Sequence, residues 1–133
     1  MKEIYEKWHK YAKERETKAL IELYAEDAVF ESPLVPILIN KDSGILRGKT
    51  EILAFLNEGT RRRPNELVRW YRTGKYFITG DVLVWEYPRQ TPDGEQVDIL
   101  ELMEIRNGLI VNHRIYWGCF GTQMLIKSAL ENK

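Results

Sequence analysis

The sequence predicts an α+β fold in which helices come first and an antiparallel sheet follows. Two observations carry this prediction. Apolar residues in the first part of the chain recur with a helical period, whereas the later part consists of runs of β-branched and aromatic residues separated by turn signals. The chain has 133 residues and shows no repeat or linker, so we expect a single domain over residues 1–133.

The N-terminal segment predicts two helices. From Ile4 to about Arg15 one face is apolar and carries Trp8 and Tyr11. Thr17 can cap a second, shorter helix whose inward side includes Tyr24.

The next segment predicts a short strand, a long irregular stretch and a third helix. The strand covers 28–31 and ends at a Ser-Pro pair, and the stretch 33–48 lacks a regular pattern. Its apolar part, 34–46, is a candidate lid, because so many apolar side chains are costly in water unless something covers them. The third helix covers 49–57, and Gly59 is expected to end it.

The second half of the chain predicts a meander of four strands and a terminal helix. Short turns separate the strands, so neighbours in sequence should pair antiparallel. The expected strands cover 67–79, 82–91, 96–106 and 109–119, and the helix covers 122–132.

The last hairpin, around Asn107-Gly108, can form in two registers. A two-residue loop pairs Arg106 with Leu109 but mixes apolar and polar residues on each face. A three-residue loop pairs Ile105 with Leu109 and separates the faces, so we prefer it. One face then carries Val97, Ile99, Glu101, Met103, Ile105, Leu109, Val111, His113, Ile115 and Trp117, and the other includes Leu100, Leu102, Ile110 and Tyr116.

In the preferred register Glu101 and His113 lie directly opposite each other as the only ionisable groups of an apolar face. Directly paired side chains have Cβ atoms about 5 Å apart, which allows a hydrogen bond. Such a pair can transfer a proton to or from a bound carbonyl, hydroxyl or epoxide oxygen. The alternative is a satisfied buried pair that fixes the strand register and performs no chemistry.

Composition excludes several classes of function. Twenty basic and twenty acidic residues give zero net charge, which argues against nucleic-acid binding. No segment has the length of a membrane span, and the charged N-terminus does not resemble a signal peptide, so we expect a cytoplasmic protein. Cys119 is the single cysteine and is expected to be a buried, inert thiol. No spacing suggests a metal site or a cofactor motif.

Three segments carry a resemblance to a known family. They are LYAEDAVFESP (Leu23–Pro33), RGKTEILAFL (Arg47–Leu56) and DILELMEIRNGLIVNHRIYWG (Asp98–Gly118). With the order of the elements, they make the chain similar to the SnoaL-like group of the nuclear transport factor 2-like superfamily. The resemblance covers nearly the whole chain, and it is more specific for fold than for function.

The resemblance implies a cone, in which a curved antiparallel sheet wraps around the N-terminal helices and a pocket opens at the wide end. The superfamily includes ketosteroid isomerases, polyketide cyclases, scytalone dehydratase, epoxide hydrolases and non-catalytic binding domains. Many members are dimers through the outer sheet face. A homodimer is therefore expected here, with Leu100, Leu102, Ile110 and Tyr116 in the interface.

The isomerase residues carry over only in part. Ser32 stands where the isomerases have the Asp base before a proline, and a serine cannot take a proton from carbon as a carboxylate does. Trp8 aligns with their oxyanion-binding tyrosine and can only donate. Glu101 aligns best with their protonated acid. Cyclase-like members use an acid and a histidine inside the cone, which is similar in chemistry to Glu101 and His113.

Two functions therefore stay open. The first is a cofactor-independent enzyme that performs acid–base chemistry on a small apolar ring compound, as an isomerase, cyclase, dehydratase or epoxide hydrolase would, with Glu101 and His113 as catalytic residues. The second is a ligand-binding or assembly module on the same fold. The expected lining residues, for which core packing is the alternative role, are Trp8, Tyr11, Phe55, Trp85, Met103 and Trp117.

Overall fold

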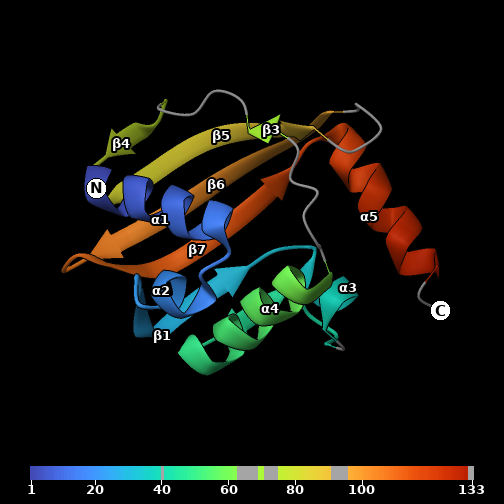
Figure 1. The fold of residues 1–133 in the computed structure, drawn as a ribbon, viewed down its shortest axis with the longest axis horizontal. Coiled ribbons are helices and arrows are strands. Elements are labelled where there is room, and N and C mark those ends of the chain that lie inside the picture. Colours follow the sequence, from blue (N-terminus) through green and yellow to red (C-terminus); the bar gives the residue numbers. More distant parts are fainter. Residues whose placement is uncertain (40, 63–68, 71–74, 91–95, 132–133) are drawn as a thin grey trace.

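The computed structural model describes residues 1–39, 41–62, 69–70, 75–90 and 96–131, with five helices and seven strands over these ranges. The sheet curves across the molecule, and α1 (Lys2–Glu14) and α2 (Thr17–Ile21) lie over one of its faces (Figure 1). The α+β class and the cone-like arrangement predicted from the sequence are confirmed.

The helices follow the predicted order, but several of their bounds differ from the predicted ones. The 33–48 stretch contains a single helical turn, α3 (Val35–Leu38), and α4 (Lys49–Arg62) continues through Gly59 instead of ending there. Helix α5 (Cys119–Glu131) begins immediately after the last strand and extends away from the end of the sheet (Figure 1). Cys119 is exposed at its first turn, so the expectation of a buried thiol was wrong.

The strands form one mixed sheet in the order β2-β1-β7-β6-β5-β3, with β4 also paired to β5. Neighbouring strands in the described ranges pair antiparallel, except that β1 and β7 are parallel. The bounds are β1 (Tyr24–Glu31), β2 (Ile45–Arg47), β3 (Arg69–Trp70), β4 (Phe77–Thr79), β5 (Val82–Gln90), β6 (Gln96–Arg106) and β7 (Leu109–Trp117). Parts of the predicted strands 67–79 and 82–91 lie outside the described residues.

The register of the β6–β7 hairpin differs from the predicted one. Arg106 pairs with Leu109, so the loop has two residues, and both carry positive φ (Asn107 52°, Gly108 76°), as a type I′ turn requires. Ile105 pairs with Ile110 and Glu104 pairs with Asn112, so β7 contains one extra residue between these two pairs. This irregularity is a β-bulge that restores the separation of the faces beyond it.

The bulge changes the positions near the turn. Ile110 is fully buried and Leu109 is exposed, so the expectation that Ile110 belongs to the outer face was wrong. Beyond the bulge, His113 shares the inner face with Glu101 as predicted, but it is paired with Met103, and Glu101 is paired with Ile115. The acid and the imidazole are thus diagonal neighbours and do not lie directly opposite each other.

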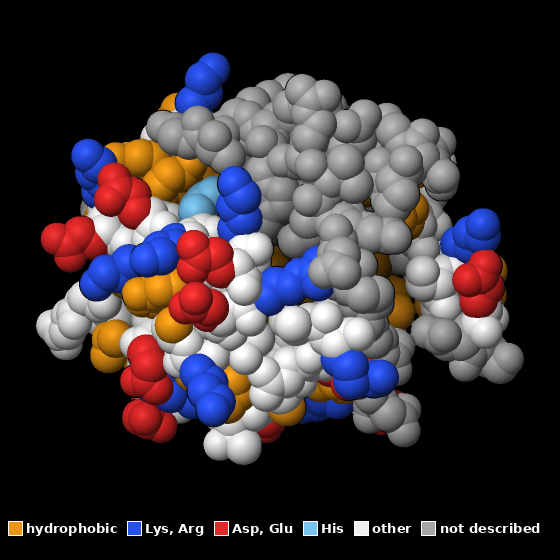
Figure 2. Space-filling model, in the orientation of Figure 1, with side chains coloured by type: hydrophobic (Ala, Val, Ile, Leu, Met, Phe, Trp, Pro, Cys, Tyr) orange, Lys and Arg blue, Asp and Glu red, His pale blue; other side chains and the backbone are white. Residues whose placement is uncertain are grey.

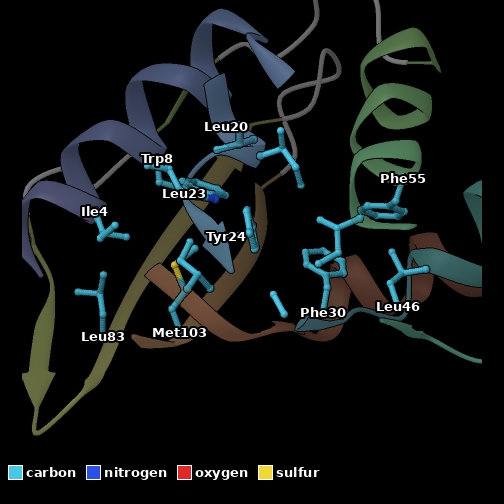
Figure 3. Packing of buried hydrophobic residues seen from close by; sticks show 14 of the residues in the cluster. Ile4, Trp8, Leu20, Leu23, Tyr24, Phe30, Leu46, Phe55, Leu83 and Met103 are labelled. Atoms are coloured by element: carbon cyan, nitrogen blue, oxygen red, sulfur yellow. The ribbon is translucent and has the colours of Figure 1, made fainter. Parts of the chain in front are cut away.

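The core lies between the sheet and the helices. Figure 3 shows Ile4 and Trp8 of α1 and Phe55 of α4 facing side chains of the strands, among them Phe30 and Met103. Trp8 and Trp85 have ring centroids 5.2 Å apart, so aromatic packing fills the end of the cone beneath α1.

Charged side chains of both signs intermix over the described part of the face seen in Figure 2. None of the helices in the described ranges combines the length and the apolar character needed to cross a bilayer.

We predict opposite effects for alanine at two glycines. Gly108→Ala should destabilise the fold by about 1–2 kcal/mol, because its φ of +76° is unfavourable for an L-residue while its surroundings are open. Gly59→Ala should stabilise it by about 0.5–1 kcal/mol, since this glycine is helical and a Cβ would meet Leu38 at an ordinary 3.6 Å. Urea unfolding of both variants measures the difference. An unchanged or higher stability of Gly108→Ala would contradict the turn assignment, and a lower stability of Gly59→Ala would contradict the helical assignment.

Candidate functional site

Three buried polar side chains form a hydrogen-bonded chain inside the cone. The Tyr24 hydroxyl lies 2.8 Å from His113 Nδ1, and His113 Nε2 lies 3.0 Å from Glu101 Oε2. Tyr24 has no exposed surface, and His113 and Glu101 are each 1% exposed. A polar network this deep in an apolar core is costly unless its members satisfy one another, which both nitrogens of the imidazole do here.

Three strands position these hydrogen-bonded side chains. Tyr24 opens β1, His113 lies on β7 and Glu101 on β6, and His113 is the parallel partner of Phe30 on β1. Diagonal neighbours on one face are about 7–8 Å apart at the backbone, a span that a glutamate and a histidine bridge together. The register set by the bulge therefore fixes the contact between the acid and the imidazole.

The hydrogen-bonded chain can hold or release one proton without losing either contact. With Glu101 ionised, His113 Nε2–H donates to the carboxylate and the Tyr24 hydroxyl donates to Nδ1. After uptake of one proton the imidazole can donate from both nitrogens, with the Tyr24 oxygen as acceptor. Burial raises the pKa of Tyr24, a hydrogen bond with Trp8 opposes this rise, and the charge of Glu101 adds to it, so Tyr24 remains a neutral phenol.

A cavity of about 180 Å³ opens beside these three hydrogen-bonded side chains. Its deep end is formed by buried residues of the sheet and its outer end by half-buried residues of α1, α2 and α4. This volume is below the roughly 300–1,000 Å³ of drug-sized sites, so the cavity suits a small ligand. Its lining consists of Trp8, Tyr11, Ala12, Arg15, Thr17, Leu20, Tyr24, Phe30, Ser32, Leu34, Leu38, Phe55, Leu56, Gly59, Thr60, Ile99, Glu101, His113, Ile115 and Trp117.

Most of the residues predicted from sequence meet in this cavity. Glu101 and His113 line it, together with Trp8, Tyr11, Phe55 and Trp117. Trp85 and Met103 do not belong to the lining, because they lie in the packed core, where Trp85 contacts the rings of Tyr5, Trp8 and His9. The sequence predicts that these two residues contact a ligand. They are instead packed in the core, because α1 covers their end of the sheet.

Sequence reasoning missed Tyr24 and misplaced His9. Tyr24 was assigned to a helix on its apolar period, whereas it is the first residue of β1 and points to His113. His9, a histidine of the charged first helix for which sequence reasoning gave a surface position, is half-buried, and its Nδ1–H donates to the Tyr5 carbonyl at 2.8 Å. Burial lowers the pKa of His9 despite this bond. No local pattern signals the contact of Tyr24, because its partner His113 lies 89 residues further along the chain.

Trp117 offers a hydrogen-bond donor in the cavity wall. Its indole Nε1 is buried and has no acceptor among the described residues, and the same holds for Trp85. Helix α5 packs closely on the Trp117 ring, since a Cβ at Gly121 would lie 2.7 Å from it. The terminal helix thereby holds this ring against the cavity.

The predicted lid contributes directly to the site. Leu34 and Leu38, at the two ends of α3, line the cavity, and Leu38 also borders a second, open groove of about 1120 Å³ between α3, β7 and α5. The described residues contain no group of three or more His, Cys, Asp or Glu side chains that could hold a metal ion.

Fold and site together define the class of the protein as an α+β cone with three hydrogen-bonded polar side chains at the floor of an apolar cavity. Solved structures agree. A SnoaL-like protein of unknown function from Burkholderia thailandensis is 18% identical with a TM-score of 0.71, and the match covers 89% of this chain and 93% of that one.

Two further structures are provisionally named after enzymes. One, named a ketosteroid isomerase from Kribbella flavida, is 17% identical with a TM-score of 0.65 over 87% of this chain and 76% of that one. The other, named a polyketide cyclase from Sinorhizobium meliloti, is 18% identical with a TM-score of 0.66 over 86% and 94%. At these identities the similarity demonstrates the fold alone.

The model of the SnoaL-like domain matches residues 5–113, so the chain belongs to the SnoaL-like family. The matched range includes Tyr24, Glu101 and His113 and ends at the imidazole. No curated protein matches the sequence.

We predict that Tyr24→Phe destabilises the fold by about 1–3 kcal/mol, because His113 Nδ1 loses its buried partner. Tyr11→Phe is the matched control and should stay within about 0.5 kcal/mol, since its ring is half-buried at the outer part of the cavity. Urea unfolding compares the two. Equal losses would show that the Tyr24 hydroxyl contributes nothing specific.

Proposed function

We propose that the protein is an enzyme that performs acid–base chemistry on a small apolar ring compound without a cofactor, with Glu101 and His113 as its catalytic residues. The observation that carries the proposal is a carboxyl and an imidazole hydrogen-bonded at 3.0 Å, both 1% exposed and both lining an apolar cavity. A carboxyl and an imidazole that are paired and buried beside a cleft are typical of catalytic sites.

The proposed mechanism uses the charge state of the hydrogen-bonded chain. Glu101 as a carboxylate removes a proton from the substrate at a carbon next to a carbonyl, or from a bound hydroxyl or water. His113 stabilises the charge on the acid through Nε2, and Tyr24 stabilises the imidazole through Nδ1. The Trp117 indole N–H, buried in the wall, is available to the substrate oxygen on which negative charge develops.

Glu101→Gln should lower proton transfer by about 10²–10⁴-fold, which is the usual contribution of a positioned acid or base. We suggest following hydrogen–deuterium exchange at the α-carbons of a panel of small cyclic ketones by NMR in D₂O, with ligands first selected by thermal shift. Wild-type protein should accelerate exchange for at least one ketone of the panel, and the variant should not.

Glu104→Gln is the matched control. Glu104 lies on the same strand, half-exposed on the outer face and paired with Arg114 at 3.3 Å. It should retain wild-type exchange rates. Full activity in Glu101→Gln with an intact fold would remove the catalytic assignment.

A binding module without chemistry is the second candidate, and Ser32 favours it. Ser32 lies in the cavity wall where the isomerases have their base, and its Oγ accepts a hydrogen bond from the Leu34 amide at 3.1 Å. Its hydroxyl thus stabilises the turn before α3. Under this alternative, Glu101→Gln changes ligand affinity, and the wild type exchanges no ligand protons.

We also propose a homodimer through the outer sheet face. Leu100 and Leu102 are half-buried there and Tyr116 is 51% exposed, which gives an apolar patch on the outer face beside the groove that α5 borders. Light scattering should give twice the chain mass of 15.7 kDa. Tyr116→Glu should weaken the dimer, whereas Lys7→Glu, exposed on α1 over the opposite face of the sheet, should not. A monomeric wild type at micromolar concentration would contradict the proposal.

A further inference from the structure

The cavity has a second polar region at its outer end. Arg15 lines it, and so do Thr17 and Thr60, all three half-buried. The residues of the hydrogen-bonded chain at the deep end are at most 1% exposed, so the burial of the lining decreases from Glu101 toward Arg15. Between these ends the wall is apolar and aromatic, as at Phe55 and Trp117.

The backbone fixes the place of Arg15. It follows the last residue of α1 and adopts the left-handed conformation, with φ 59° and ψ 34°. Its amide donates to the Ala12 carbonyl, and the next amide donates to the Tyr11 carbonyl. A non-glycine residue in this conformation is uncommon, because it costs about 1 kcal/mol or more. The geometry closes the helix and places the residue at the cavity mouth, where a glycine would close it at lower cost.

The guanidinium of Arg15 forms no ion pair with a described residue. No described carboxylate lies within ion-pair distance of its guanidinium, and its sequence neighbours Glu14 and Glu16 are exposed and outside the cavity lining. Arginine offers a planar fork of donors that matches a carboxylate in two parallel hydrogen bonds. The two threonine hydroxyls beside it can donate as well.

We infer that the ligand of this cavity is an apolar ring compound that carries a carboxylate, held by Arg15 at the mouth while its ring reaches toward Glu101. This deepens the proposed function and rests on the same cavity. A single guanidinium balances the one charge of a carboxylate, whereas a phosphate would bring −1.5 to −2 charges to one cation. The deep end, with its own acid, excludes a second anion through repulsion.

The test uses pairs of ligands that differ only in this charge. Benzoate, phenylacetate, 3-phenylpropionate and 4-phenylbutyrate are each compared with their primary amide by calorimetry or thermal shift. For the best-fitting length the acid should bind at least about tenfold more tightly than its amide, which corresponds to about 1.4 kcal/mol. The preference should shrink at high salt, because the outer end of the cavity is partly solvated.

Two variants identify the residue responsible. Arg15→Gln should remove the preference and leave amide affinity unchanged, and Arg15→Lys should retain only part of it because the fork is lost. Glu101→Gln should keep the preference, so a failure of the catalytic proposal leaves this result intact. Equal binding of acids and amides by the wild type, equal loss of both in Arg15→Gln, or binding of neither series would overturn the inference.

Discussion

The hydrogen bonds of the His113 imidazole are the interaction on which the rest of the site depends. An imidazole that is 1% exposed must find partners inside the protein, and it finds them in a tyrosine from β1 and a glutamate from β6. These strands flank β7 on its two sides, so the same three side chains connect the helical half of the chain to the meander. The free-energy cost of burying these three side chains is offset only when their strands are in register. Their hydrogen bonds therefore favour one arrangement of the sheet.

The bulge in β7 is the local feature that makes this arrangement possible. A type I′ turn at Asn107-Gly108 without any irregularity would place polar and apolar residues of the two strands on the same face. One extra residue in β7 corrects the alternation, buries Ile110 and brings His113 next to Met103 and diagonal to Glu101. The turn geometry and the face separation, which conflict in a regular hairpin, are both satisfied.

The cavity has a polar region at each end, and we assign recognition to one and chemistry to the other. Aromatic side chains from α1, α4 and β7 form its middle, the proton-sharing residues form its floor, and Arg15 and two threonines form its mouth. Members of this family share the scaffold more than the reaction, so the identity of the polar groups in the lining decides what each protein does. Here Ser32 hydrogen-bonds to the turn before α3, and the acid–imidazole pair is the group to which we assign proton transfer.

The sequence by itself determined the order of the elements, the α+β class and the presence of Glu101 and His113 on one inner face, because these depend on local periodicity and on side-chain parity along a strand. It could not determine the bulge, since turn preference and face separation pointed to different registers and only packing of Ile110 decides between them. Nor could it find Tyr24, whose strand pairs with β7 from far along the chain. The separation of Trp85 and Met103 from the cavity likewise depends on where α1 crosses the sheet, which is a property of tertiary packing and not of any local pattern.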